Sequence, residues 1–379
     1  LQLSNSVYYN QRLFDGKLPF GSGGIIDLNR AFWGYKLNVN IQGYLNYDLG
    51  FSYNTQKDDR QRFFNDEGIK ADQVMGQNEN YKNTSLYFFG SKSLGKLNFS
   101  GGARFENNVI SLDSYFKPSD KKTRRINSFN PSVNFLYEFD KIDVFANFSS
   151  GYETPTLNEL SATSNQTGFN DDLKNIKSNT FEIGFANLKK DNIINYSIRL
   201  FNISTINEIT PYQLNDGLVL YSNAGKTTKK GAEVEFNGKI SDQLNFEYAA
   251  SIGNYKFESF KFIENDFSNN LIPGIPKSQH NIKIKYKNES NFNLVVGLKR
   301  VGKMFADNAN KTEIDGYSSI NVKMSKNLNL FETSITPFIS IDNLFNNEYF
   351  DNIRINAFGS RFYEPAPGIN FIGGLKLNL

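Results

Sequence analysis

Residues 36–53 read Lys-Leu-Asn-Val-Asn-Ile-Gln-Gly-Tyr-Leu-Asn-Tyr-Asp-Leu-Gly-Phe-Ser-Tyr, and their apolar and polar side chains alternate on both sides of Gly43. A period of two is typical of a β-strand with one apolar face, whereas an amphipathic helix repeats every 3.6 residues. The pattern returns at 232–237 and at 282–287, where the charged residues all fall on one face. The sequence therefore predicts an all-β protein built from antiparallel strands.

The connections between these segments alternate between short and long, which distinguishes a barrel from a soluble sandwich. Short turns are expected near Gly43, 94–95, 140–141, 190–191, 241–242, 288–289 and 327–328, and long polar loops at 11–30, 54–80, 107–127, 152–178, 205–228, 256–276, 302–314 and 346–366. Outer-membrane barrels combine short periplasmic turns with long outer loops. Counting from Ser4–Tyr9 to Gly368–Leu379 gives about sixteen strands of a transmembrane antiparallel β-barrel, an even number as in most such barrels.

Composition excludes several other classes of protein. The 42 basic and 39 acidic residues are scattered, so the chain has no basic surface for nucleic acid. It has no Cys, which removes disulfides and thiolate metal sites, and no apolar run of the length that a membrane-spanning helix needs. No linker divides residues 1–379, and the first residue is Leu rather than Met. We expect one region, the C-terminal part of a barrel from a longer precursor.

Several motifs, in order, resemble those of the TonB-dependent receptor family. They are the stretch from Phe148 through Glu153-Thr154-Pro155 to Glu159-Leu160, Asn170-Asp171-Asp172-Leu173, Asn223-Ala224-Gly225 with Gly231-Ala232-Glu233, Pro273-Gly274-Ile275-Pro276, Asp342-Asn343-Leu344-Phe345, and Arg361-Phe362-Tyr363-Glu364-Pro365. Two prolines that the family places near Asn170 are missing, and the chain ends in Leu379 where such barrels commonly end in an aromatic residue. The resemblance covers most of the chain.

This resemblance implies a bacterial outer-membrane receptor of 22 strands, whose lumen is filled by an N-terminal plug domain that a TonB box precedes. Neither the plug nor the box is expected within these residues. The implied partners are the TonB complex, outer-membrane lipid and a scarce nutrient, which we expect to be a ferric siderophore. Cobalamin, another metallophore or a carbohydrate remain alternative ligands, and a passive porin is an alternative function.

Siderophores are often anionic and aromatic, so positively charged side chains and aromatic side chains are the candidates for binding them. Those in the expected outer loops are Arg124, Arg125, Tyr152, Phe169, Arg354, Arg361 and Tyr363. Each is also a possible solvated surface residue. The chain has a single histidine, His280, expected at a strand start near the barrel rim. With one His and no Cys, we expect no catalytic site, no bound metal site and no cofactor.

Overall fold

The computed structural model describes residues 1–19, 21–116, 121–160, 170, 172–187, 193–213, 219–330 and 333–378. Among these described residues, seventeen strands belong to one antiparallel sheet, and four further two-stranded hairpins lie outside it. Helical structure in the described part of the chain is limited to a 3-10 turn at Phe358–Ser360, and no helix there is long and apolar enough to cross a membrane. The predicted all-β, antiparallel class is therefore confirmed.

The strands of the large sheet are β1 (Gln2–Lys17), β2 (Ile25–Ile41), β3 (Asn46–Asp66), β4 (Ile69–Leu94), β5 (Leu97–Ser114), β6 (Lys122–Glu138), β7 (Asp143–Glu153), β8 (Ile176–Asn187), β9 (Ile194–Ile206), β12 (Lys226–Lys239), β13 (Leu244–Ser259), β16 (Ser278–Lys287), β17 (Phe292–Val301), β20 (Tyr317–Lys326), β21 (Leu328–Leu330), β22 (Thr333–Asp342) and β25 (Asn370–Asn378). The hairpins are β10 (Ile209–Gln213) with β11 (Val219–Asn223), β14 (Lys261–Phe262) with β15 (Asn265–Asp266), β18 (Met304–Phe305) with β19 (Glu313–Ile314), and β23 (Phe350–Ile353) with β24 (Tyr363–Pro365).

The count of seventeen exceeds the expected sixteen because of β21. The sequence predicts a turn at 327–328, but the chain resumes as β21 after Asn327 and pairs with the same neighbour, β22, that β20 already contacts. Strands β20 and β21 therefore occupy the position of a single strand beside β22. The short turns between β2 and β3, between β12 and β13, and between β16 and β17 lie where the sequence predicts them.

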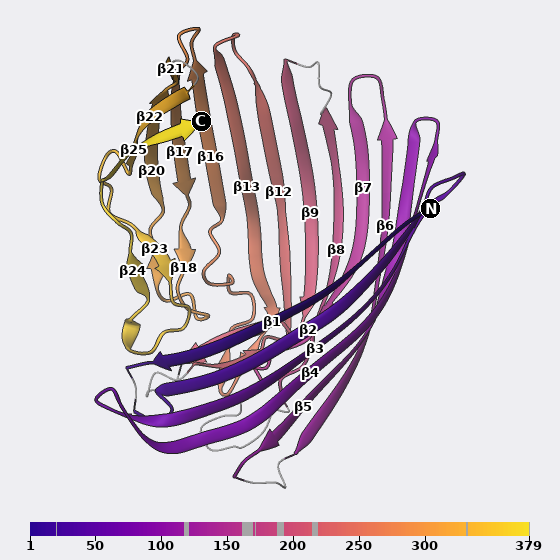
Figure 1. The fold of residues 1–379 in the computed structure, drawn as a ribbon, viewed down its shortest axis with the longest axis vertical. Helices are drawn as coiled ribbons and strands as arrows, with labels where there is room; N and C mark the ends of the chain where they lie inside the picture. The colour runs from indigo at the N-terminus through magenta and orange to yellow at the C-terminus, as the bar shows by residue number, and fades with distance from the viewer. Residues whose placement is uncertain are drawn as a thin grey trace. The chain divides into compact units, whose positions relative to one another are not determined.

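The described chain divides into two compact units. Unit 1 comprises residues 1–136, 147–180 and 205–225, and unit 2 comprises residues 137–146, 181–204 and 226–379. Strands β1 to β5 of unit 1 pair consecutively and antiparallel, and Figure 1 shows them as long neighbouring strands coloured from indigo to purple. In unit 2, β12, β13, β16, β17, β20, β22 and β25 pair in that order.

One face of unit 1 is apolar because the alternating residues of adjacent strands stay in register. Leu37 lies opposite Phe51, Phe51 opposite Leu86, and Leu86 opposite Phe105. Many of these side chains are exposed, as in Leu86 and Phe105, each 57% accessible. An exposed apolar band on a sheet of alternating residues is the lipid-facing surface expected of an outer-membrane barrel strand.

The predicted loops at 54–80 and 107–127 are largely strand. Strands β3 and β4 continue as a ladder to a turn at Glu67 and Gly68, both with positive φ. Past Tyr53 the next positions on this face of β3 are polar: Thr55, Lys57, Asp59 and Gln61. The hairpin therefore extends beyond the apolar band, and its polar composition resembles that of a loop although its backbone groups remain paired in the sheet.

A small core in unit 1 explains the motif around Glu159-Leu160. Thr156 and Glu159 bond reciprocally: the Thr156 backbone N–H donates to Glu159 Oε2 at 2.7 Å, and the Glu159 N–H donates to Thr156 Oγ1 at 3.2 Å. This capping box tightens the turn and directs Leu157 and Leu160 inward. They pack in a buried cluster with Ile110, Leu112, Ile126 and Leu173. The loop after β7 is thus anchored on the sheet.

Candidate functional site

Two predicted ligand residues of unit 1 take part in anchoring that loop. Arg124 Nη1 donates to the Leu173 carbonyl at 2.6 Å, and Asn175 Nδ2 donates to the Tyr152 hydroxyl at 2.7 Å. Tyr152 also packs against the leucine core. Arg125 is exposed and, as the next residue in β6, points to the opposite face of the strand. Phe169 lies outside the described residues.

The three predicted ligand residues of unit 2 all lie on the β23–β24 hairpin and its loop. Arg354 Nε donates to Glu364 Oε1 at 2.5 Å, and Arg361 Nε donates to the Phe358 carbonyl at 3.2 Å. Tyr363, 43% exposed, stacks on Phe350 with a centroid distance of 4.5 Å. The hairpin therefore presents two guanidinium groups and a stacked aromatic pair to solvent, a combination suited to an anionic or aromatic ligand.

Asparagine side chains hold this hairpin against neighbouring outer segments of unit 2. Asn310 Nδ2 donates to the Leu271 carbonyl at 2.8 Å, while its Oδ1 accepts the Leu271 N–H at 2.7 Å. The Asn308 N–H donates to Asn356 Oδ1 at 2.9 Å. Beneath them, Ala306, Ile314, Ala357 and Phe362 form a buried cluster. We call the segments 256–276, 302–314 and 346–366 the outer platform of unit 2.

The Asp342-Asn343-Leu344-Phe345 motif fixes the base of this platform. Asn343 has φ of 51° and is 3% exposed, so its side chain is committed to local bonds. Its Nδ2 donates to the Asn347 carbonyl at 2.9 Å, and its Oδ1 accepts the Asn347 N–H at 2.9 Å. Asparagine tolerates the left-handed backbone and bonds to nearby peptide groups, which accounts for this residue type here.

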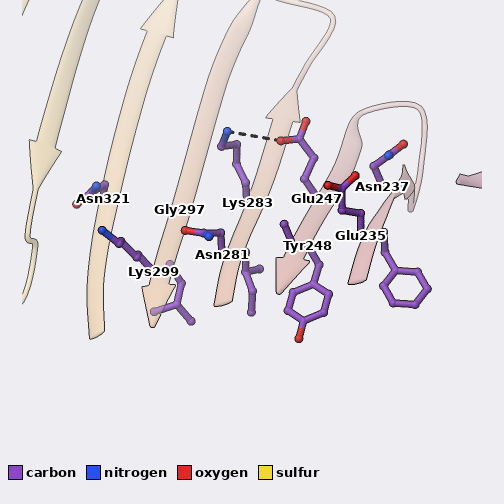
Figure 2. Close-up of a pocket in the computed structure, with 13 residues that line it drawn as sticks. Glu235, Asn237, Glu247, Tyr248, Asn281, Lys283, Gly297, Lys299 and Asn321 are labelled. Atoms are coloured by element: carbon purple, nitrogen blue, oxygen red, sulfur yellow. Dashed lines mark ion pairs between the residues drawn. The ribbon is translucent and has the colours of Figure 1, made fainter. Parts of the chain in front are cut away.

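A second candidate site, not singled out from the sequence, lies on the polar face of unit 2. It is a groove of about 590 Å³ that crosses β12, β13, β16, β17 and β20 (Figure 2). Its polar lining includes Glu235, Glu247, Asn281, Lys283, Lys299 and Asn321, and Gly297 lies among them. Lys283 Nζ lies 3.5 Å from Glu247 Oε2, and Lys285 pairs with the same carboxylate. We call this feature the lysine groove.

Unit 1 holds a buried charge cluster on the polar face of its long strands. Arg30 donates to both oxygens of Asp58, from Nε at 2.9 Å and from Nη2 at 2.6 Å, and the Asp58 side chain is 0% exposed. Arg60 Nε lies 3.0 Å from Glu79 Oε1, and Glu79 is also buried. The register places Arg30, Asp58 and Glu79 opposite one another on β2, β3 and β4.

This cluster lies past the apolar band, in the extended part of the β3–β4 hairpin. Burial raises the pKa of the Glu79 carboxyl above its ordinary value of 4.5, although Arg60 and the Gln77 amide act in the opposite direction. Glu79 Oε2 has no hydrogen-bond partner among the described residues. The arrangement braces three strands against one another and leaves one carboxylate oxygen without a bond.

The lone histidine lies where the sequence predicts, in β16 near the strand start. His280 Nδ1 is 3.0 Å from the Tyr248 hydroxyl, and the two rings stack. Its ring belongs to a row of stacked aromatic side chains that includes Phe236. Across the described ranges, no group of three or more His, Cys, Asp or Glu residues is placed to hold a metal ion.

Comparison with known proteins assigns the class. Residues 1–344 match the family described as TonB dependent receptor-like, beta-barrel, and the chain belongs to that family. The ferrioxamine receptor of Yersinia enterocolitica is 22% identical over 264 residues, which cover 67% of this chain and 34% of that receptor.

Solved structures of the same fold agree with this assignment. The unliganded ferric citrate transporter FecA superposes with a TM-score of 0.81 at 18% identity, covering 99% of this chain and 59% of FecA. The ferric yersiniabactin uptake receptor FyuA of Yersinia pestis gives 0.74 at 14% identity, covering 99% and 58%. The copper transporter OprC gives 0.79 at 14% identity, covering 99% and 62%. The chain thus spans about three-fifths of these structures.

Proposed function

We propose that the full-length protein is a TonB-dependent receptor of the bacterial outer membrane that imports a ferric siderophore. Family membership and the ferric-chelate ligands named for FecA, FyuA and the ferrioxamine receptor support this assignment. Its partners are then the TonB complex, outer-membrane lipid and the chelate. Neither a plug domain nor a TonB box is identified in these residues, and both belong to the proposal for the full-length protein.

The observation that carries the ligand proposal is the β23–β24 hairpin. Arg354, Arg361 and Tyr363 all belong to this exposed hairpin and its loop, and Phe362 between them packs in the buried cluster of the outer platform. A guanidinium that contacts an anionic chelate contributes about 1.5–3 kcal/mol, and aromatic contacts add less. Arg124 and Tyr152 support the loop after β7, and we assign them a structural role in addition to any contact with ligand.

The test is ligand binding by the full-length receptor in detergent, titrated with ferric siderophores, cobalamin and oligosaccharides. Replacing Arg361 and Tyr363 together with Ala should weaken ferric-siderophore binding by about tenfold or more, since one charged contact and one stacking contact are lost. Leu328→Ala, an exposed residue at the opposite end of unit 2's strands, is the matched control.

A strain that lacks the gene should also grow poorly when iron is limiting. Normal growth on low iron combined with failure on cobalamin or a glycan would replace the siderophore with that nutrient while the receptor class stands. Ion conduction by the complete protein, without binding of any of these ligands, would favour a passive porin.

A further inference from the structure

The exposed apolar face of unit 1, which we call its outward face, contains a groove of about 460 Å³ that crosses β2, β3, β4 and β5. The register places four of its lining residues side by side across these strands: Val39, Leu49, Phe88 and Ala103. Ala103 lines the groove beside Phe88 and Phe105, and its single methyl group fills less space than either ring. We call this feature the Ala103 groove, and its width and apolar lining suit a hydrocarbon chain.

A row of aromatic side chains lies beyond this groove, toward the turn of the β3–β4 hairpin. The rings of Trp33 and Tyr53 lie 5.4 Å apart on the outward face. Tyr9 of β1 is opposite Trp33 and is 66% exposed. Tryptophan and tyrosine are enriched where the hydrocarbon of a membrane meets water. This row therefore marks the edge of the apolar band on the side of the β3–β4 turn.

Two lysines lie at and just beyond this edge, on the same outward face. Lys82 of β4 is opposite Thr55, which is itself opposite Trp33, so Lys82 lies at the level of the aromatic row. Lys57 occupies the next outward position of β3 after Thr55. Both lysine side chains are exposed.

Arg125 of β6 is a third cation at this level. The rings of Phe105 and Phe129 lie 4.6 Å apart, and Asn107 Nδ2 donates to Asn127 Oδ1 at 2.7 Å, so β5 and β6 present these residues on the same outward face. Alternation makes Arg125 the next outward residue of β6 toward its start, and it is exposed. Arg125 therefore lies on the outward face with the two lysines.

No carboxylate of the described residues balances these three cations at their level. The outward positions of β2 to β6, from the level of Phe51 to that of Lys57, hold no Asp or Glu. The next acidic residues along this face are already bonded: Asp59 Oδ1 accepts a hydrogen bond from the Tyr115 hydroxyl at 2.7 Å, and Asp113 Oδ2 lies 3.8 Å from Lys121 Nζ. Within the described ranges, no carboxylate lies within ion-pair distance of Lys57, Lys82 or Arg125.

The spacing between the groove and the cations matches the dimensions of a membrane lipid. Lys82 lies four residues along β4 from Leu86, which lines the groove, and this separation is about 13 Å at 3.3 Å per residue. In a strand tilted as in outer-membrane barrels, it corresponds to about 10 Å along the membrane normal. The hydrocarbon of one leaflet is about 15 Å thick. A lipid with an acyl chain in the groove therefore has its head group at the level of the cations.

We propose that the outward face of unit 1 binds a phosphorylated lipid of the outer leaflet, with its phosphate at Lys57, Lys82 and Arg125 and an acyl chain in the Ala103 groove. Clustered Lys and Arg at head-group level attract anionic lipids, and both side chains donate charge-assisted hydrogen bonds to phosphate. This inference rests on the outer-membrane location in the proposed function and is independent of the nutrient that is imported. It assigns Arg125 to lipid rather than to the chelate.

The experiment measures lipid binding by the full-length receptor in a non-ionic detergent. The probes are lipid A, the same lipid with its phosphates removed, and inorganic phosphate as a competitor. One double variant, Lys57→Gln with Lys82→Gln, removes two charges, and Ala103→Phe fills the groove. Lys92→Gln is the matched control, because Lys92 lies on the outward face of β4 at its opposite end, where its Nζ donates to the Tyr44 carbonyl at 2.5 Å.

The double lysine variant should bind lipid A about tenfold more weakly or worse, because each basic residue near a membrane surface strengthens anionic-lipid binding about fivefold. Ala103→Phe should weaken binding about tenfold, the equivalent of about two methylene groups displaced from the groove. Lys92→Gln should bind as the wild type does. A second double variant, Lys57→Arg with Lys82→Arg, keeps the charges and should retain wild-type binding, which separates loss of charge from loss of folding.

Three results would overturn the lipid site. They are wild-type affinity for lipid A in the double glutamine variant, equal binding of the phosphate-free lipid by the wild-type protein, and displacement of lipid A by inorganic phosphate, which would indicate a site for soluble anions. Wild-type affinity in Ala103→Phe would show that the acyl chain does not occupy the groove.

The lipid site and the receptor function can fail separately. Ferric-siderophore binding is measured on the same proteins, and the double glutamine variant should match the wild type, since its substitutions lie on the outward face. If the wild-type protein binds no ferric siderophore while the lipid results hold, the proposed nutrient is wrong and the lipid site stands. If siderophore binds and lipid A does not, the receptor function stands and the lipid site is wrong.

Discussion

Replacing Asp58 with Asn should loosen the extended β3–β4 hairpin, because the substitution keeps the side-chain volume but removes a buried charge. Asp58 is fully buried and accepts hydrogen bonds from Arg30 Nε, Arg30 Nη2 and Gln56 Nε2 at 2.9, 2.6 and 3.0 Å. Arg60 Nη2 lies 3.9 Å from Asp58 Oδ2. After the substitution, Arg30 faces an amide whose nitrogen cannot accept its second bond.

Removing one partner of a buried ion pair typically costs about 3–5 kcal/mol, since the other charge stays buried without compensation. Arg30 is 28% exposed and can turn partly to water, so we expect the lower end, about 3 kcal/mol. The Asp27–Lys70 pair provides a matched control in the same unit, with side chains 36% and 45% exposed. Asp27→Asn should cost about 0–1 kcal/mol, as exposed pairs do.

The assay is amide hydrogen exchange of the β3–β4 hairpin in the refolded protein, combined with urea unfolding in detergent. Asp58→Asn should raise exchange at the hairpin by about two orders of magnitude, the equivalent of about 3 kcal/mol, and Asp27→Asn should not. The double variant Arg30→Met with Asp58→Asn should recover part of the loss, because the uncompensated guanidinium is gone. Equal effects of Asp58→Asn and Asp27→Asn would refute the reasoning.

Two further predictions address the membrane face and pH. Val39 lies opposite Leu49 on the apolar face, whereas Asn38 accepts a hydrogen bond from Tyr87 on the polar face. Val39→Lys should therefore destabilise the protein by about 2–4 kcal/mol, and Asn38→Lys by far less. Equal losses of stability in a lipid-refolding titration would contradict this orientation. Because burial raises the pKa of Glu79 in the folded state, its proton favours folding: the contribution is fully present below pH 4.5 and is lost as pH rises through the folded pKa. Glu79→Gln should flatten this part of the pH dependence of hairpin exchange, and an unchanged slope would show that another group causes it.

The sequence predicts the strands well wherever one face is apolar, and less well past the apolar band. Around Val39 and Leu49, for example, apolar residues alternate with non-apolar ones, and this alternation indicates a strand. Residues 58–62 carry charge on both faces, so the alternation disappears although the ladder continues. Polar composition alone cannot separate a solvated hairpin from a loop.

The arrangement of the candidate ligand residues is likewise predictable from the sequence only in part. The opposite orientations of Arg124 and Arg125 follow from alternation, and the sequence contains that information. The lysine groove is harder to find, because Lys283, Gly297 and Asn321 meet only through the pairing of β16, β17 and β20. The one sequence signal is the run of lysines on one face of 282–287, which does not reveal what lies beside it.

The asparagine bonds of the outer platform have a consequence for how such a receptor diversifies. Asn310 and Asn343 hold backbone atoms, so the positions they fix do not depend on the side chains displayed beside them. Tyr363 and Arg361, by contrast, are exposed to solvent. If the hairpin binds the ligand as proposed, substitutions among the displayed residues would change ligand preference one at a time, while the scaffold below them keeps its conformation.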